Sequence, residues 1–403
     1  MSASTTLRRN RDFKLLLSGQ VVSFVGDQAQ DIALPLLVLG LTGSSVQAGL
    51  VLGLNTASYL VFGLLAGALV DRWDRKTTMI WCEIGRALLT VSVIVALAFG
   101  HLTMPHLYVM AGLTGILTTL FQVANTAALP SVVGTTQLPA ALGYTQSALN
   151  TVRIFGASLA GILYSAGRTV PFLVNAVSFT VSAASLRLMR ADFQEERRIG
   201  SARLRTDVRE GLSWLWGQPV IRFLTLASAA DNLRYGAGYL IIITLAQGVS
   251  ASPLEIGLIF SAAAVGAMLG SLVSHRAIRR FRLGRIAVVM LWIEALTFPL
   301  YALAPNPLLL GVVAAAESLI APIYAVAIST HRLTSTPDRL RGRTASAAGT
   351  LTTGALAVGA MLGGVLIASL GPKSTVLICA AWLAALAILT TANRAVRQAP
   401  VVR

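Results

Sequence analysis

The sequence predicts an all-α integral membrane protein with twelve transmembrane helices in two pseudo-symmetric six-helix bundles. Its 403 residues are 55% hydrophobic and only 12% charged, and the mean hydropathy is +0.73. This balance is typical of polytopic membrane proteins. The apolar runs are about 20 residues long, enough to cross ~30 Å of hydrocarbon as a helix. They are continuous rather than alternating, which favours helices over barrel strands.

The expected spans follow one another with short connections. They cover residues 15–40, 47–70, 78–100, 106–129, 139–166, 169–189, 220–247, 255–274, 285–304, 308–330, 344–369 and 375–393. The first run is long and follows a charged segment, which predicts a retained helix rather than a signal peptide. The polar stretch between the sixth and seventh runs predicts an N-terminal bundle at 1–190, a partly helical cytoplasmic linker at 191–218 and a C-terminal bundle at 219–403.

The basic residues alternate between the two sides of the expected bundle. Of 32 Lys and Arg residues, 27 fall on one side, two fall on the other, and Arg86, Arg153 and Arg234 lie within spans. Because basic loops stay inside the cell, we expect both termini to be cytoplasmic in a bacterial plasma membrane. Topology and anionic lipid headgroups account for the net charge of +16, so nucleic acid is not an expected partner.

Short matches relate the two halves of the chain. Asp27 and Gln28 recur 204 residues later as Asp231 and Asn232. Gly49 and Gly257, at the starts of corresponding runs, are instead 208 residues apart, so a duplication requires a gap.

A dense charged turn separates the second and third spans. We expect this turn to act as a conformational gate. The gate includes four polar residues of the turn, the small residue Gly67 before it and the basic residue Arg343 before the eleventh span. The four polar residues are Asp71, Arg72, Arg75 and Lys76. An Asp at one helix end is stabilised by the free amides at the N-terminus of another helix. Thr344 and Ser346 are the expected capping residues of that second helix. The alternative is that these charges only set topology.

This turn resembles the signature loop of the major facilitator superfamily. The matching residues are Gly67, Asp71, Arg72, Arg75 and Lys76. The segments Arg9–Phe13, Gly26–Asp27 and Ala33–Leu36 are similar to the branch that contains macrolide-efflux and siderophore-export proteins. The resemblance implies the major facilitator fold, drug efflux, and a turn that holds the cytoplasmic side shut in the outward-facing state. The chain departs from drug antiporters in lacking a Gly-Pro pair in the fifth span and an arginine in the fourth, where Arg153 of the fifth span is the nearest substitute.

Six acids lie within expected spans, where a charge costs at least ~2.5–3.5 kcal/mol and usually has a function. They are Asp27, Asp31, Glu83, Asp231, Glu294 and Glu317. The resemblance implies that the first, fourth, seventh and tenth helices line the cavity, which singles out Asp27, Asp31, Asp231 and Glu317 for proton coupling. Asp27 and Asp31 share one helix face. Glu83 and Arg86 have the spacing of a local ion pair, and we expect that pair rather than a substrate site. Asp231 and Arg234 have the same spacing, so pairing within one helix is the alternative to proton coupling there.

Aromatic residues within the spans suit a cavity for bulky, weakly polar compounds, although most aromatics at helical spacing serve packing. The expected cavity residues are Phe24, Tyr59, Phe121, Tyr144, Arg153, Tyr235, Tyr239 and Tyr324. The sequence shows no nucleotide-binding loop, no metal-ligand set and no nucleophile-base pair, so no cofactor, metal or enzymatic activity is expected.

The expected function is secondary export of lipophilic small molecules, such as drugs or antibiotics, by alternating access with proton antiport. The expected partners are a small-molecule substrate, protons and the bilayer, and the protein is expected to act as a monomer. Export of a specific metabolite or siderophore is the main alternative. A channel remains open as a third class, although two six-helix halves favour rocking about a central site.

Overall fold

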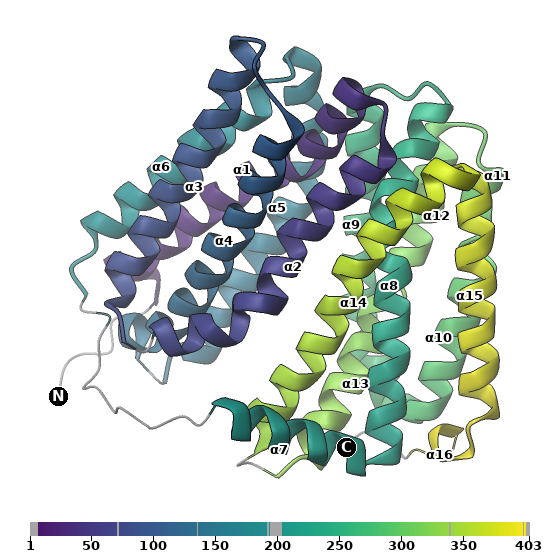
Figure 1. The fold of residues 1–403 in the computed structure, drawn as a ribbon. Helices are drawn as coiled ribbons and strands as arrows, with labels where there is room; N and C mark the ends of the chain where they lie inside the picture. Colours follow the sequence, from purple (N-terminus) through teal and green to yellow (C-terminus); the bar gives the residue numbers. More distant parts are fainter. Residues whose placement is uncertain are drawn as a thin grey trace. The chain divides into compact units, whose positions relative to one another are not determined.

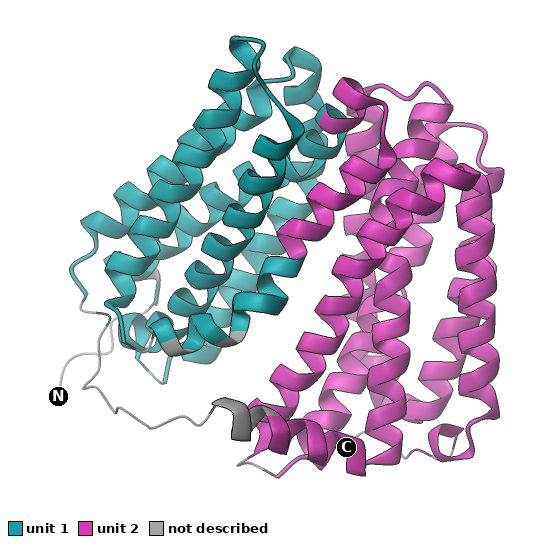
Figure 2. Cartoon of the chain, in the orientation of Figure 1, with its two compact units in different colours: residues 1–37, 57–201 teal, residues 38–56, 202–403 magenta. Residues whose placement is uncertain are grey.

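The computed structural model describes residues 7–70, 72–134, 136–191, 193, 204–337, 340–397 and 399. In these residues all regular structure is helical. The chain divides into two compact units: residues 1–37 with 57–201, and residues 38–56 with 202–403 (Figure 2). We call them unit 1 and unit 2. The expected bundle boundaries at 190 and 219 stay a prediction.

Unit 1 is built from six long helices, whose positions agree with the expected spans (Figure 1). They are α1 (Arg11–Thr42), α2 (Ser45–Val70), α3 (Arg75–Ala98), α4 (Met104–Val133), α5 (Leu138–Ala166) and α6 (Val170–Leu188). The last turn of α1 and the first half of α2 belong to unit 2. Within unit 1, α3 packs against both α4 and α6.

Unit 2 adds ten helical segments among the described residues. They are α7 (Leu204–Gly217), α8 (Pro219–Gly248), α9 (Pro253–Arg280), α10 (Leu283–Thr297), α11 (Leu300–Leu303), α12 (Pro307–Ser318), α13 (Ala321–Ser335), α14 (Arg341–Leu370), α15 (Pro372–Ala392) and α16 (Arg394–Arg397). Two expected spans are broken, near Pro299 and Pro322. Proline lacks an amide hydrogen and clashes with the preceding turn, so it ends or kinks a helix.

Ten helical segments of the described residues are long and apolar enough to cross a membrane. They count α10 with α11, and α12 with α13, as single segments. The helices α5 and α8 reach 29 and 30 residues but are not among the ten. The apolar, multi-pass character of the chain is confirmed, and the number of twelve spans stays a prediction.

Close backbone approach holds the helices that carry charged residues. A Cβ added at Gly359 of α14 would lie 1.9 Å from the carbonyl oxygen of Leu233 on α8. One added at Gly266 of α9 would lie 2.0 Å from the carbonyl oxygen of Ala315 on α12. In unit 1, a Cβ at Gly26 of α1 would lie 2.8 Å from the Cα of Asn175 on α6. Small residues let helices approach in this way. These three contacts therefore position α8, α12 and α1 for the sites below.

Candidate functional site

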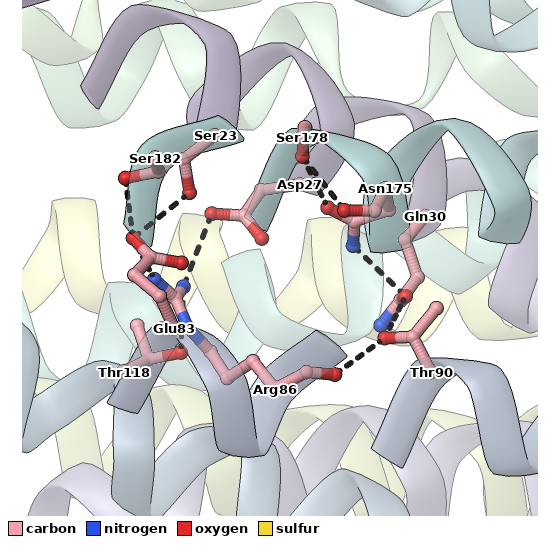
Figure 3. Close-up of polar contacts among 10 residues, drawn as sticks. All are labelled: Ser23, Asp27, Gln30, Glu83, Arg86, Thr90, Thr118, Asn175, Ser178 and Ser182. Atoms are coloured by element: carbon pink, nitrogen blue, oxygen red, sulfur yellow. Dashed lines mark hydrogen bonds and ion pairs between the residues drawn. The ribbon is translucent and has the colours of Figure 1, made fainter. Parts of the chain in front are cut away.

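Arg86 of α3 is the centre of a buried charged cluster in unit 1 (Figure 3). Its guanidinium lies 2.8 Å from the Glu83 carboxylate one turn away and 3.5 Å from the Asp27 carboxylate on α1. The Arg86 side chain is 2% exposed and Glu83 is fully buried. We call Asp27, Glu83 and Arg86 the Arg86 cluster. It links two helices through one cation.

Hydroxyl groups and aromatic rings complete the surroundings of this cluster. The Ser182 hydroxyl of α6 donates to Glu83 Oε1 at 2.9 Å, and the Ser23 hydroxyl of α1 lies 3.4 Å from the same oxygen. The guanidinium carbon of Arg86 lies 4.3 Å from the ring centroid of Phe179 and 5.1 Å from that of Phe121. Cation–π contacts stabilise a desolvated guanidinium by about 2 kcal/mol or more.

A neutral polar network extends from the same cluster (Figure 3). The Thr90 hydroxyl donates to the Arg86 carbonyl oxygen at 2.9 Å and lies 3.3 Å from Gln30 Oε1. The same Gln30 oxygen accepts a 2.9 Å hydrogen bond from Asn175 Nδ2. The network thus joins α1, α3 and α6 by groups that carry no charge. It gives the buried Gln30 and Asn175 amides partners in an apolar environment.

Unit 2 contains a second buried cluster, which we call the Arg234 cluster: Asp231, Arg234 and Glu317. Arg234 Nη2 lies 2.9 Å from Asp231 Oδ1 on the same helix, and Arg234 Nη1 forms an ion pair with Glu317 of α12. The Tyr301 hydroxyl donates to Glu317 Oε2 at 2.8 Å. The guanidinium carbon lies 4.9 Å from the Phe298 ring centroid. Like Arg86, Arg234 therefore joins two helices and contacts aromatic rings.

Carboxylates outnumber cations in both clusters. The Arg86 cluster has two acids for one arginine. Beside the Arg234 cluster, Glu294 of α10 is 2% exposed and within electrostatic range of Arg234, so three acids surround one cation there. Burying negative charge without a matching cation is costly. Each cluster nevertheless carries more acidic than basic groups in the interior of its unit.

Three of the four predicted proton-coupling residues form ion pairs with arginines in the structure. They are Asp27, Asp231 and Glu317. Asp31 is exposed on α1, one turn beyond Asp27. The expected local pairs Glu83–Arg86 and Asp231–Arg234 are confirmed. Sequence reasoning missed the pairings of Asp27 with Arg86 and of Glu317 with Arg234, because both connect residues that are far apart in the chain.

The charged turn makes contacts within unit 1. Arg75 Nη1 donates to the carbonyl oxygens of Ala127 and Phe193, at 2.9 and 3.1 Å. Lys76 Nζ donates to the Met189 carbonyl oxygen at 2.6 Å. The Asp74 carboxylate accepts from the Thr77 amide at 2.7 Å and caps α3. These residues thus hold the end of α3 against segments near the ends of α4 and α6.

The other expected gate residues that the structure describes do not share the contacts of Arg75 and Lys76. Gly67 lies near the end of α2, Arg72 is exposed, and Asp71 lies outside the described residues. Arg343 forms an ion pair with Glu210 of α7. The expected capping by Thr344 is wrong: α14 begins at Arg341, and the Thr344 hydroxyl donates to the Leu340 carbonyl oxygen at 3.1 Å. Ser346 also lies inside α14. The helix therefore begins before Thr344 and includes the basic residues Arg341 and Arg343.

The expected cavity residues differ from one another in burial and in contacts. Phe24 lies 5.7 Å from the Arg153 guanidinium carbon, and Tyr239 stacks on Phe260 with centroids 4.4 Å apart. Tyr59, Tyr144 and Tyr235 are exposed, whereas Phe121 and Tyr324 are buried. A lining role for these residues stays a prediction.

The family model described as transmembrane secretion effector, of the major facilitator superfamily, matches residues 2–400. The chain belongs to this family. The resemblance of the charged turn and of the opening segment is thereby confirmed.

Relatives in other bacteria match most of the chain. The multidrug efflux pump Tap of Mycolicibacterium fortuitum is 27% identical over 90% of this chain and 91% of the pump. The enterobactin exporter EntS of Salmonella typhi is 24% identical over 84% of this chain and 81% of the exporter. The crystal structure of the nucleoside transporter NupG has a TM-score of 0.78 at 13% identity and covers 94% of this chain and 98% of the transporter. The expected major facilitator fold is confirmed.

Because the chain belongs to a transporter family, its two buried charged clusters are candidate functional sites. Interior ionisable groups in membrane transporters mark ion or substrate pathways. In this chain such groups are concentrated around Arg86 and Arg234.

Proposed function

We propose that this protein is a secondary exporter of lipophilic small molecules, of the drug or antibiotic class, that works by alternating access with proton antiport. The observation that carries the export proposal is the whole-length similarity to the multidrug efflux pump Tap. The excess of buried carboxylates over arginines supports the proton coupling. The protein acts as a membrane-embedded monomer with both termini in the cytoplasm, and it transports its substrate rather than transforming it.

In this proposal the acids of the clusters carry the proton. Asp27 is 29% exposed, whereas its partner Arg86 is 2% exposed, so Asp27 is the more accessible group of the pair. Asp31, one turn away and exposed, supplies a second carboxylate on the same face. When Asp27 binds a proton, its attraction to Arg86 is lost, and Arg86 keeps Glu83 as its counterion. Asp231 and Glu317 have the corresponding roles around Arg234.

Export of a specific siderophore or metabolite is the second candidate. The observation that favours it is the similarity to the enterobactin exporter EntS. The first candidate requires a protein that accepts several unrelated lipophilic compounds, whereas the second requires one that accepts a single cargo. The two candidates therefore make different demands on the cargo and can be separated by the choice of test compounds.

The direct test uses inside-out membrane vesicles from a pump-deficient bacterial host and ethidium as the first probe. Uptake should require an imposed pH gradient and should stop when a protonophore collapses it. Asp27→Asn and Asp31→Asn should both impair this uptake, and Glu255→Gln, in the capping box at the start of α9, serves as the matched acid-to-amide control. Uptake that ignores the protonophore, or that survives both Asp substitutions, would rule out the coupling.

Substrate class is tested in the same host by susceptibility and accumulation. Protection against several unrelated lipophilic antibiotics supports drug export. If the host gains no such protection but secretes more of a catecholate siderophore, the second candidate is correct and the first is wrong.

A further inference from the structure

An apolar groove lies on unit 1 between α3 and α6, which run side by side (Figure 1). It has a volume of about 350 Å³. Its walls include Ile84, Leu88 and Val91 of α3 and Ala183, Ala184 and Arg187 of α6. None of these residues belongs to the Arg86 cluster, so the groove is separate from the site described above.

The groove follows from the residue spacing on the two helices. On α3 the lining residues fall at 84, 87, 88 and 91, and on α6 they fall at 180, 183, 184 and 187. Both sets have the i, i+3, i+4, i+7 spacing of a single helix face. Alanine at 87, 183 and 184 leaves the space between the helices unfilled. The first and last lining residues of each helix are seven positions apart, so the groove extends about 10 Å along the helices at 1.5 Å per residue.

The walls of the groove are open to the surroundings of unit 1. Leu88 is 65% exposed and Val91 is 41% exposed. In a membrane-spanning segment, exposed aliphatic side chains of this kind face hydrocarbon. We therefore expect the groove to open toward hydrocarbon rather than toward water.

A positive charge lies at one end of the groove. Arg187 is exposed in the last turn of α6. Among the described residues, no carboxylate is within ion-pair distance of its guanidinium. Lys76, which donates to the Met189 carbonyl oxygen, and the exposed Arg190 lie near the same end of α6. At the same end the Asp12 carboxylate accepts from the amides of Arg190 and Ala191, at 3.1 and 2.9 Å. Three basic side chains against one acid leave the open end of the groove with a net positive charge.

We propose that this groove binds one acyl chain of an anionic phospholipid, with the lipid phosphate on the guanidinium of Arg187. An aliphatic chain fits the apolar walls. Guanidinium forms paired hydrogen bonds with phosphate oxygens, which is the geometry that arginine supplies and lysine does not. A juxtamembrane basic residue is also attracted to an anionic leaflet. Chain and headgroup are therefore recognised at opposite ends of one site.

The test uses full-length protein reconstituted in nanodiscs of phosphatidylcholine containing a minority of phosphatidylglycerol. After release into mild detergent, native mass spectrometry counts the lipids that remain bound. Wild-type protein should retain phosphatidylglycerol in preference to phosphatidylcholine. Arg187→Gln should abolish this preference, and Arg187→Lys should keep part of it. Ala184→Leu, which fills the groove, should reduce retention of both lipids.

Two matched variants control for charge and for side-chain size. Arg279→Gln removes one exposed arginine from α9, and Val181→Leu enlarges an exposed residue of α6 that does not line the groove. Both should retain phosphatidylglycerol like the wild type. Retention that Arg187→Gln and Ala184→Leu leave unchanged overturns the proposal. In a second outcome, inorganic phosphate abolishes the preference for phosphatidylglycerol while Ala184→Leu leaves lipid retention unchanged. That result would show an anion contact without a site for the acyl chain, and it would also overturn the proposal.

Discussion

The guanidinium of Arg86 on α3 lies 3.5 Å from the carboxylate of Asp27 on α1. Asp231, 204 residues after Asp27, is also paired with an arginine. In unit 2 that arginine, Arg234, comes from the same helix as the acid and reaches across to Glu317 on α12 instead. The two units therefore keep an acid–arginine pair at corresponding places while supplying the cation from different helices.

We expect Arg86→Met to destabilise the protein by about 3–5 kcal/mol, because it leaves buried acids without their cation. Thermal unfolding in detergent, followed by circular dichroism, measures the loss. Arg153→Met is the control, since Arg153 is exposed and its contact with the Phe24 ring is long. Equal effects of the two substitutions would show that the buried charge pair is not the source of the stability.

Glu317→Gln should separate transport from stability in unit 2. It removes an acid that pairs with Arg234, so gradient-driven uptake should fall to background if Glu317 carries a proton. Tyr301→Phe removes only the hydroxyl that donates to Glu317. Loss of a hydrogen bond to a charged group costs about 1.5–3 kcal/mol in unfolding, but coupling should persist. If the two variants lose coupling equally, Glu317 acts through packing rather than through its proton.

Gly359→Ala should destabilise unit 2 by about 1–3 kcal/mol, because the new methyl group would collide with the Leu233 carbonyl on α8. Gly349→Ala on the same helix is the control, since an added Cβ there meets nothing within 4 Å. That change should be neutral or slightly stabilising. The comparison is made by thermal unfolding, and similar losses in both would show that α8 and α14 tolerate a wider separation.

The ion pair between Arg343 and Glu210 should contribute little to stability, because both side chains are exposed. A double-mutant cycle with Arg343→Gln and Glu210→Gln should give a coupling of about 0.2–1 kcal/mol. Gly211→Leu should have a larger effect, since even a Cβ at Gly211 would lie 2.6 Å from the Arg343 carbonyl oxygen. Limited proteolysis of α7 reports its detachment from α14. Release of α7 by Arg343→Gln alone would mean that the ion pair, and not the backbone contact, holds it.

Asp71→Asn should impair transport far more than Ser274→Ala. Near the end of α9, Ser274 follows Gly270 by four residues, as Asp71 follows Gly67. The reason is that only the first of these positions carries an acid able to interact with a helix N-terminus. Ethidium uptake in vesicles with an imposed pH gradient compares the two. Equal impairment would favour a purely topological role for the charged turn.

Most helix positions could be predicted from the sequence, because a span must be both apolar and about 20 residues long. The breaks near Pro299 and Pro322 were missed, although proline was the available signal. The sequence predicts that α14 starts at Thr344, three residues later than it does, because threonine is a common capping residue. In the structure the Thr344 hydroxyl instead donates to the Leu340 carbonyl oxygen. Capping depends on the backbone conformation of the capping residue, which composition does not reveal.

The sequence by itself determined the membrane-spanning class and the local pairs Glu83–Arg86 and Asp231–Arg234, whereas the orientation of the basic loops stays a prediction. Each of these depends on properties that are read within one helix or one loop. Only the tertiary structure decided that Asp27 shares Arg86 with Glu83 and that Arg234 reaches Glu317. Those contacts require helices that are distant in the chain to pack at a particular rotation and depth, which close contacts at residues such as Gly26 and Gly266 determine.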